Sequence, residues 1–205
     1  MIKTAFFVPK KDVVMEDLIK EKSSIPQFLW EMNEEYINEL SSKKNLPSAY
    51  RSLIGIKLLG ELIADNGINP RLKRDANGRP FIENIPNMDF NISHSDSLVV
   101  CALCISDKIT ARIGVDCEEI YKKDPLSISK RFFTEKEHKK ILSSENKAYT
   151  FTELWTKKEA YLKHLGTGLE KPLSSFESDE TGLCFETLTI EKNIVSLCYC
   201  KGAEE

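Results

Sequence analysis

The sequence predicts an α+β protein built from two halves, each with helical segments and paired strands. A helix-like pattern of apolar residues covers residues 25–40 and 48–67, and strand-like segments follow it. The same order of helices and then strands returns in the second half. The halves are similar in length but show no clear sequence self-similarity, so the duplication is one of pattern alone. We therefore expect an N-terminal lobe at residues 1–107 and a C-terminal lobe at residues 108–205.

The composition is that of a globular protein. The chain has 205 residues, of which 41% are hydrophobic and 30% charged, enough to bury a core in one domain or two small packed lobes. The formal net charge of -3 does not predict a nucleic-acid-binding protein. The N-terminus has too short an apolar stretch for a signal peptide, and no apolar run reaches the roughly 20 residues of a membrane span. We expect a cytoplasmic protein that binds neither nucleic acid nor membrane.

Capping residues and glycine delimit the elements of the first half. Residues 25–40 alternate apolar and acidic side chains in a helix-like way. The next helix is expected to begin at the cap Ser48 and to end at Gly67. Its buried face is predicted to consist of Leu53, Ile56, Leu59 and Ile63. The turn-rich segment ANGRPFIENIPN then leads through DFNISHS into a buried strand, LVVCALCI.

The second half follows the same order. The segment ITARIGVDCEEI is predicted to be a strand. Pro125 can open a helical segment, and Thr134 and Glu137 form a capping box for the next helix. A long helix is expected over about residues 148–165, ending at Gly166. A hairpin turning at residues 191–193 completes the predicted fold.

The cysteines do not predict a disulfide or a metal site. Cys101 and Cys104 form a C-x-x-C pattern inside the predicted strand. Residues three apart in a strand point to opposite faces, so these two thiols would not converge. With three histidines and no second C-x-x-C, a zinc site is not expected. We interpret the thiols as small buried apolar groups.

Two pairs of charged residues are candidates for a metal or phosphate site. Asp116 and Glu118 are two residues apart at a strand end, which puts both carboxylates on one face. Convergent carboxylates suit Mg²⁺, although an acidic strand end exposed to water has the same pattern. Glu159 and Lys163 share a helix face, either in a site or as a surface pair that contributes about 0.3–0.5 kcal/mol. Trp155 on the same helical row favours a buried side for that face.

Polar residues before the buried strand form a candidate phosphate site. Ser93 and His94 can each donate one hydrogen bond, and Arg79 on the preceding turn can grip phosphate with two. Arg51 and Ser52, in the first turn of a helix, extend the set because helix N-termini attract anions. Taken alone, His94 is also explained as a structural histidine.

The order and combination of these segments resemble the 4′-phosphopantetheinyl transferases of the Sfp type. The matching pieces are N-G-R-P-F (77–81), F-N-I-S-H-S (90–95), I-G-V-D-C-E (113–118), K-R-F-F-T-x-x-E (130–137) and L-W-T-K-K-E-A-Y-L-K (154–163), followed by G-x-G-L. They occur in the family's order over about residues 50–176. The combination of G-V-D-x-E with W-T-x-K-E-A-x-x-K is highly specific to this family.

The resemblance implies two pseudo-twofold-related α/β lobes with the active site between them. It implies an enzyme that transfers the 4′-phosphopantetheine group of coenzyme A to a serine of an apo acyl or peptidyl carrier protein. The reaction would depend on Mg²⁺ and release adenosine 3′,5′-bisphosphate. The metal ligands carried over by position are Asp116, Glu118 and Glu159. The coenzyme A-binding residues carried over are Arg51, Ser52, Arg79, Ser93, His94 and Lys163.

The catalytic residues carried over are Glu159, Lys163 and Glu137. Lys163 matches a lysine that contacts the transferring pyrophosphate, and Glu137 matches a carboxylate near the metal or the attacking serine. The group that takes the serine proton is left open between Glu159, Glu137 and a metal-bound water.

The resemblance also implies an acidic carrier protein as partner. The segment from Lys122 to Lys140 is basic and contains Phe132 and Phe133, so we expect it to form the docking face, with at least one of the two rings in the core. A monomer is expected, because two lobes in one chain complete one site. The carrier would belong to fatty acid, polyketide or nonribosomal peptide biosynthesis, and the sequence favours none of these.

Two positions depart from the pattern of the family. Relatives carry a basic cluster before the position of Arg51, where Lys43 or Lys44 would act in this chain. Close relatives often have glycine after the His-Ser pair, where this chain has Asp96, a carboxylate that would weaken coenzyme A binding unless it points away. Two other functions fit the same residues: a Mg²⁺-dependent pyrophosphate hydrolase, and a non-catalytic protein that binds coenzyme A or a carrier.

Overall fold

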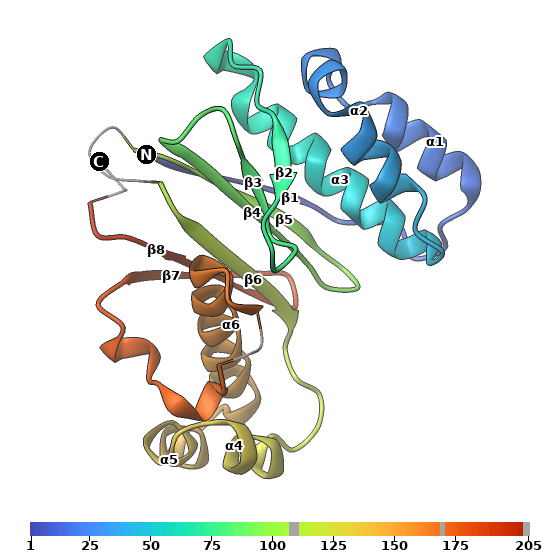
Figure 1. The fold of residues 1–205 in the computed structure, drawn as a ribbon. Helices are drawn as coiled ribbons and strands as arrows, with labels where there is room; N and C mark the ends of the chain where they lie inside the picture. The colour runs from blue at the N-terminus through green and yellow to red at the C-terminus, as the bar shows by residue number, and fades with distance from the viewer. Residues whose placement is uncertain (107–110, 169–170, 203–205) are drawn as a thin grey trace.

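Two three-stranded antiparallel sheets, each covered by helices, form the chain (Figure 1). The computed structural model describes residues 1–106, 111–168 and 171–202. The first sheet has the order β1-β5-β4, and the second has the order β6-β8-β7. The strands are β1 (Ile2–Phe7), β4 (Met88–His94), β5 (Val99–Ile105), β6 (Ile113–Glu119), β7 (Cys184–Ile190) and β8 (Asn193–Tyr199). A small hairpin, β2 (Leu72–Arg74) and β3 (Pro80–Ile82), lies beside them.

The two halves share one topology. In each half a first strand is followed by helices and then by a hairpin, whose last strand takes the centre of the sheet. β5 is central in the first sheet and β8 in the second. This repeat confirms the predicted α+β class and its pseudo-duplicated order. The boundary predicted between residues 107 and 108 falls outside the described residues.

Helices cover the outer face of each sheet. The first half has α1 (Met15–Ser23), α2 (Gln27–Ser41) and α3 (Leu46–Ile63), and the second has α4 (Leu126–Phe132), α5 (Glu135–Ser143) and α6 (Lys147–Leu165). Short 3₁₀ turns lie at Ala64–Asn66, Leu173–Ser175 and Ser178–Glu180. α6 packs on β6 and β8, while α4 and α5 lie at its far end (Figure 1). The layers therefore run helices, sheet, sheet, helices.

The helix boundaries confirm most of the predicted capping signals. Thr134 caps α5 through the predicted box with Glu137, and α6 ends at Gly166, which adopts φ 74°. α3 is capped by Asn45 instead of Ser48: the Asn45 side chain accepts a hydrogen bond from the Ser48 amide at 2.9 Å. Gly67, with φ 60°, follows the 3₁₀ turn that extends α3.

The Asn-Ile-Ser-His segment lies within a strand of its own, whereas the sequence analysis had placed it only as the lead into the buried strand. β4 pairs antiparallel with β5 along its whole length, with Ser93 opposite Val100 and His94 opposite Val99. The stretch D-F-N-I-S alternates polar and apolar residues, which is the pattern of a strand with two different faces. β1, α1 and the β2–β3 hairpin were not predicted.

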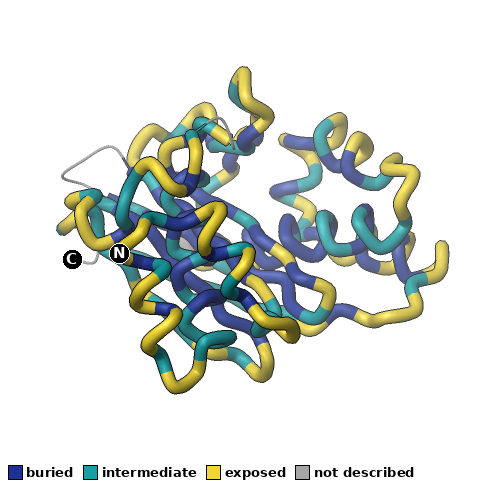
Figure 2. Tube along the Cα trace, turned by 90° about the horizontal axis from the view of Figure 1, so that it is seen from below, coloured by how far each residue is buried: buried dark blue, intermediate teal, exposed yellow. Residues whose placement is uncertain are grey.

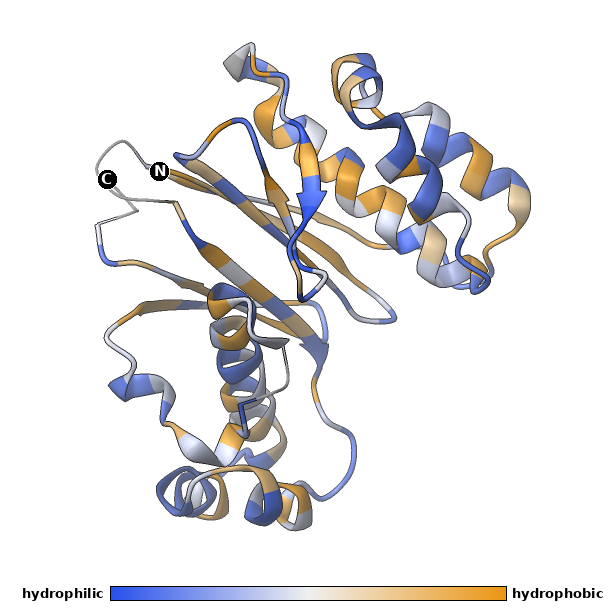
Figure 3. Cartoon of the chain, in the orientation of Figure 1, coloured by the Kyte–Doolittle hydropathy of each residue, from blue (hydrophilic) through white to orange (hydrophobic). Residues whose placement is uncertain are grey.

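The core lies on both faces of the first sheet. On β5, Cys101 and Leu103 pack with the helices, whereas Ala102 and Cys104 pack with the second sheet. Cys101 and Cys104 therefore point to opposite faces, as predicted. Figure 2 shows the buried residues concentrated in the central strands, and Figure 3 shows hydrophobic residues along α3 and the strands. Within the described residues, no helix is both long enough and apolar enough to span a membrane.

Candidate functional site

Gly114 allows α6 to pack unusually closely on β6. A Cβ atom added at Gly114 would lie 2.0 Å from the carbonyl oxygen of Ala160 and 2.5 Å from the amide nitrogen of His164. Both neighbours are backbone atoms of α6, which cannot give way as a flexible side chain can. The close approach brings the α6 face that carries Glu159 and Lys163 against the β6 carboxylate of Asp116.

A buried serine, a carboxylate and an ammonium group meet where β4, β6 and α6 come together. Lys163 Nζ donates to Asp116 Oδ1 at 2.7 Å and to Ser93 Oγ at 2.9 Å. Ser93 Oγ in turn donates to Asp116 Oδ1 at 3.0 Å. Burial lowers the pKa of Lys163, but the negative charge of Asp116 outweighs it and the pKa is raised overall. Lys163 is therefore a cation in this contact, and three predicted site residues are brought together.

Two further carboxylates face Asp116. Desolvation raises the pKa of Glu118 to about 7, and the charges of Asp116 and Glu159 add to the shift. Desolvation and then the charge of Asp116 raise the pKa of Glu159. Among the described residues, Oδ2 of Asp116 is buried and has no hydrogen-bond partner. The three carboxylates thus give the region an excess of negative charge, and Lys163 is the cation that contacts Asp116.

The three predicted metal ligands do not already form a closed cage. Among residues 1–106, 111–168 and 171–202, no three His, Cys, Asp or Glu side chains are arranged so that they could hold a metal ion. Asp116 is buried on β6, Glu118 is exposed at the end of that strand, and Glu159 is half-buried on α6.

A group of cationic side chains lies at the other end of the site. Desolvation lowers the pKa of His94, and the positive charges of Arg51 and Lys163 lower it further. Lys43 Nζ donates to Ser52 Oγ at 2.8 Å, which places this lysine beside the predicted pair Arg51 and Ser52. Lys43, Arg51, Ser52 and His94 therefore share one region at the end of β4 and the start of α3.

Asp96 lies at the edge of this cationic group and lines the same groove as Arg51 and His94, with its side chain largely in solvent. Its side chain is 92% exposed, and its closest ion-pair contact is 3.9 Å from Arg51 Nη1. The contact is long and solvated, so its effect on the site is small.

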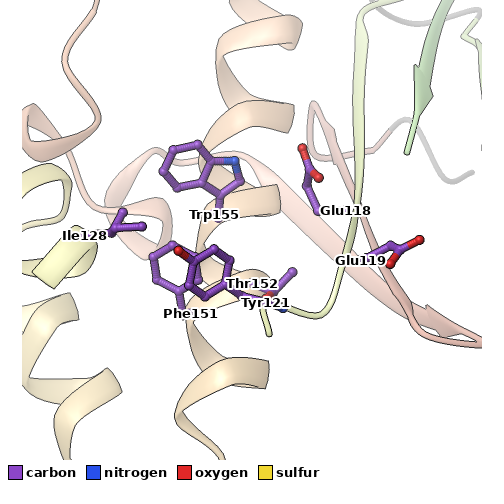
Figure 4. A pocket seen from close by; sticks show the side chains of 7 residues that line it. All are labelled: Glu118, Glu119, Tyr121, Ile128, Phe151, Thr152 and Trp155. Atoms are coloured by element: carbon purple, nitrogen blue, oxygen red, sulfur yellow. The ribbon is translucent and has the colours of Figure 1, made fainter. Parts of the chain in front are cut away.

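A groove and a pocket adjoin at Glu118, Glu119 and Tyr121. The open groove has a volume of about 520 Å³ and is lined by Arg51, His94, Ser95, Asp96 and Lys122, among others. The neighbouring cavity, called here the aromatic pocket, is lined by Tyr121, Ile128, Phe151, Thr152 and Trp155 together with Glu118 and Glu119 (Figure 4). The Phe151 ring lies 5.0 Å from Tyr121 and 5.8 Å from Trp155. A charged groove thus leads directly into an apolar pocket.

Sequence reasoning missed the aromatic pocket. Tyr121 and Phe151 belong to different elements, and their spacing of thirty residues carries no local signal. Trp155 lies on the same helix as Glu159, and this was the one hint that the helix face turns inward.

Arg79, predicted to bind phosphate, has several hydrogen-bond partners within the protein and also lines a cavity with Glu159 and Lys163. The residue is 8% exposed. Its Nη1 and Nη2 form a fork on Asp89, at 3.0 and 2.5 Å. Nη2 also donates to the Ile113 carbonyl at 2.8 Å, and Nε donates to the Lys163 carbonyl at 3.0 Å. Arg79 therefore connects β4, β6 and α6. The sequence alone did not show that its guanidinium pairs with the buried carboxylate of Asp89.

Glu137, predicted to be a catalytic residue, pairs with a buried lysine. Its Oε2 pairs with Lys158 Nζ at 2.8 Å, and the same oxygen accepts from Thr134 in the capping box. Lys158 is fully buried and also donates to the Leu173 carbonyl at 2.7 Å. In the described part of the chain, the polar contacts of Glu137 are with these residues and not with Asp116, Glu118 or Glu159. Glu137 thus neutralises a buried lysine between α5 and α6.

The sequence is similar to known proteins over most of its length. Residues 112–203 match the family model described as the 4'-phosphopantetheinyl transferase superfamily. The chain is 35% identical over 142 residues to the 4'-phosphopantetheinyl transferase gsp of Aneurinibacillus migulanus, a match that covers 66% of this chain and 56% of that protein. It is 32% identical over 160 residues to the 4'-phosphopantetheinyl transferase Sfp of Bacillus subtilis (strain 168), covering 71% of this chain and 69% of Sfp.

A solved structure of Thermotoga maritima holo-[acyl-carrier-protein] synthase matches 43% of this chain and 61% of its own, at 21% identity and a TM-score of 0.36. The match with gsp spans little more than half of that relative's length, 56%.

Proposed function

The chain belongs to the 4′-phosphopantetheinyl transferase superfamily, and we propose that it transfers the 4′-phosphopantetheine group of coenzyme A to a serine of an apo carrier protein. The observation that carries this proposal is the contact between Ser93, Asp116 and Lys163, flanked by Glu118 and Glu159. A diphosphate is densely anionic, so a site for it needs cationic groups and hydrogen-bond donors on one side. The carboxylates on the other side suit a divalent cation.

The carboxylates fit a magnesium ion in their chemistry. Oδ1 of Asp116 is engaged by Ser93 and Lys163, while Oδ2 is buried and has no partner within the described part of the chain. Desolvation, and after it the negative charge of Asp116, raises the pKa of Glu118 and of Glu159, so a bound cation would favour their charged forms. We propose Asp116, Glu118 and Glu159 as the residues that would hold Mg²⁺. When bound, the ion would neutralise the diphosphate and stabilise the charge of the transition state.

The residues of the chain have separate tasks in the proposed reaction. Lys163 neutralises charge on the diphosphate, while His94 and Arg51 bind the phosphate groups of coenzyme A. The serine oxygen forms a bond to the phosphorus of the pantetheine phosphate as the bond to the bridging oxygen breaks. Adenosine 3′,5′-bisphosphate leaves with that oxygen. Glu159 is proposed to take the serine proton, since it lies beside Asp116 and Lys163 in the proposed site, whereas Glu137 is paired with Lys158.

The 3′-phosphate is proposed to bind at the start of α3. Lys43, held at 2.8 Å from Ser52, supplies the charge that other relatives place in a basic cluster. The cationic side chains Lys43 and Arg51 and the partly exposed His94 all lie near this point. Asp96 is 92% exposed and its contact with Arg51 is long, so its charge opposes this site only weakly.

The aromatic pocket is proposed to hold the pantetheine arm. The arm is mostly apolar and carries amide groups. The pocket is lined by Trp155 and Phe151 and also by Glu118 (Figure 4). An arm placed here would leave its phosphate beside the carboxylates.

The basic face of α4 and α5 is proposed to dock an acidic carrier protein. Phe132 is 39% exposed and can contact a partner, whereas Phe133 is 4% exposed and belongs to the core, so one of the two rings is buried as expected. Lys130, Arg131 and Lys139 are exposed on the same helices. Because both halves of one chain supply the site, we propose that a single copy is active.

Replacing Lys163 with alanine should lower the rate of transfer by about 100-fold, because the diphosphate loses a cation that is already held in place. The measurement is kcat with saturating coenzyme A. Lys157→Ala is the matched control. Lys157 is also on α6, and its Nζ forms an ion pair with Glu153 Oε1, one helical turn earlier, at 2.7 Å. Equal effects of the two substitutions would return Lys163 to the status of a surface charge.

Replacing His94 with alanine should raise the KM for coenzyme A by about tenfold and leave kcat within a few-fold, because one phosphate donor is lost. Initial rates over a range of coenzyme A concentrations give both constants. Asp96→Ala, two residues away and exposed, should change neither. An unaltered KM in His94→Ala would make His94 a structural residue.

The proposed function is tested by incubating the chain with coenzyme A, Mg²⁺ and a panel of apo carrier proteins, followed by mass spectrometry of each carrier. Transfer adds one phosphopantetheine to a serine and releases adenosine 3′,5′-bisphosphate in equal amount. Release of the nucleotide without modified carrier would favour a hydrolase instead. Binding of coenzyme A without either product would favour a non-catalytic binding protein.

A further inference from the structure

The strands β4 and β6 are joined by side chains where a backbone ladder would be expected. Asp89 Oδ2 accepts a hydrogen bond from the Ile113 amide at 2.9 Å, and Asn91 Oδ1 accepts one from the Val115 amide at 2.9 Å. Ser93 Oγ accepts a third from the Cys117 amide at 3.3 Å. The partners of each rung are 24 residues apart in sequence, so the three rungs keep one register. These three bonds are called here the side-chain ladder.

The ladder satisfies the open edge of the second sheet. β6 is an edge strand that pairs only with β8 within the described sheet order, so every second amide on its other side lacks a backbone partner. Those amides lie against β4 and not in water (Figure 1). A buried amide without a hydrogen-bond partner destabilises a fold by about 1–3 kcal/mol. The polar face of β4 supplies an acceptor for three such amides of β6.

The alternation of β4 provides both this polar face and an apolar one. Asp89, Asn91 and Ser93 are 5%, 4% and 6% exposed, which is unusual for three successive polar residues of one strand face. Phe90 and Ile92 point the other way into the core under α3. In the stretch D-F-N-I-S, the apolar residues therefore pack in the core, and the polar residues form the contact between the two sheets.

Asn91 is the rung with the least additional support. Asp89 is also held by Arg79, and Ser93 is also bound to Asp116 and Lys163. Asn91 has Val115 as its hydrogen-bond partner, and Val115 immediately precedes Asp116. Loss of this rung would release the middle of β6, directly beside the site.

We propose that Asn91 is a positioning residue, whose amide oxygen holds Val115 and thereby fixes the Asp116 carboxylate against Ser93 and Lys163. The inference concerns how the site is built, and only its consequence for turnover rests on the proposed function. A displacement of about 1 Å in a reacting group can cost about 100-fold in rate, so one hydrogen bond at this point affects catalysis without touching substrate.

The test uses hydrogen exchange of the Val115 amide, followed by NMR in the full chain. Asn91→Leu and Asn91→Ala remove the acceptor, while Asn91→Asp keeps an oxygen at the same place. We expect exchange at Val115 to become at least about tenfold faster in the first two variants, as for the loss of one hydrogen bond, and to stay near wild type in the third. The amides of Val195 and Leu197 on β8 are the internal control and should remain protected in all three.

Kinetics and metal binding give independent readouts on the same variants. In Asn91→Leu and Asn91→Ala we expect kcat to fall by about 10- to 100-fold with a smaller change in the KM for coenzyme A. The affinity for Mn²⁺, measured by electron paramagnetic resonance, should fall at least several-fold. Unchanged exchange at Val115, or fast exchange with normal kcat and Mn²⁺ affinity, would overturn the inference. A wild-type chain without transfer would refute the proposed function, and the exchange and Mn²⁺ results would still decide the role of Asn91.

Discussion

Replacing Asp116 with alanine is expected to reduce phosphopantetheine transfer by about 1000-fold or more while the fold is kept. The substitution removes the acceptor of both Lys163 and Ser93 and the carboxylate proposed to be central to cation binding. The fold should survive because Lys163 is 31% exposed and its ammonium can be hydrated, and because the backbone amides of β6 keep their partners. The measurement is the rate of carrier modification, with circular dichroism to verify the fold.

Two further variants separate charge from shape at this position. Asp116→Asn keeps an acceptor of the same size but loses the charge, and it should be almost as inactive as Asp116→Ala. Asp12→Ala removes an exposed carboxylate near the N-terminus and should be fully active. Near-normal turnover in Asp116→Ala would exclude Asp116 from the site.

Replacing Gly114 with alanine is expected to destabilise the protein by more than about 3 kcal/mol, the upper end of the cost of overpacking a core. The added methyl group would lie at 2.0 Å from the Ala160 carbonyl oxygen, so α6 has to move away from β6. For a chain of this length, such a loss lowers the Tm by about 6–12 °C. Transfer should fall as well, since the movement carries Glu159 and Lys163 away from Asp116.

Gly67→Ala provides the comparison for Gly114→Ala. Gly67 has φ 60° and no heavy atom within 4 Å of an added Cβ, so alanine there meets backbone strain without a clash. That strain costs about 1 kcal/mol. If Gly114→Ala lowered the Tm no more than Gly67→Ala does, the close packing of α6 on β6 would not be needed for stability.

The sequence predicted the elements whose signals are local. The capping box at Thr134, the helix end at Gly166 and the hairpin at residues 191–193 were all identified correctly. β1 was missed, because its residues are all half-buried and show no alternation. Its identity as a strand comes from pairing with β5, about a hundred residues later in the chain.

The sequence predicted several residues of the site, but it did not show which contacts each of them makes. The sequence identified Ser93, Asp116 and Lys163, but it is the close packing at Gly114 that brings them together. Arg79 and Glu137 were predicted to contact ligands, and their motifs did not reveal that each also pairs with a buried counter-ion. In the fold, Asp89 and Lys158 are those counter-ions.

The central claim is that Asp116, Glu118 and Glu159 together hold one divalent cation beside the diphosphate of coenzyme A. Anomalous diffraction from crystals grown with Mn²⁺ and coenzyme A tests it most directly. We predict one strong manganese peak between these three carboxylates, in contact with a diphosphate oxygen and close to Lys163. A peak at any other place, or a diphosphate bound away from Asp116 with no metal beside it, would contradict the claim.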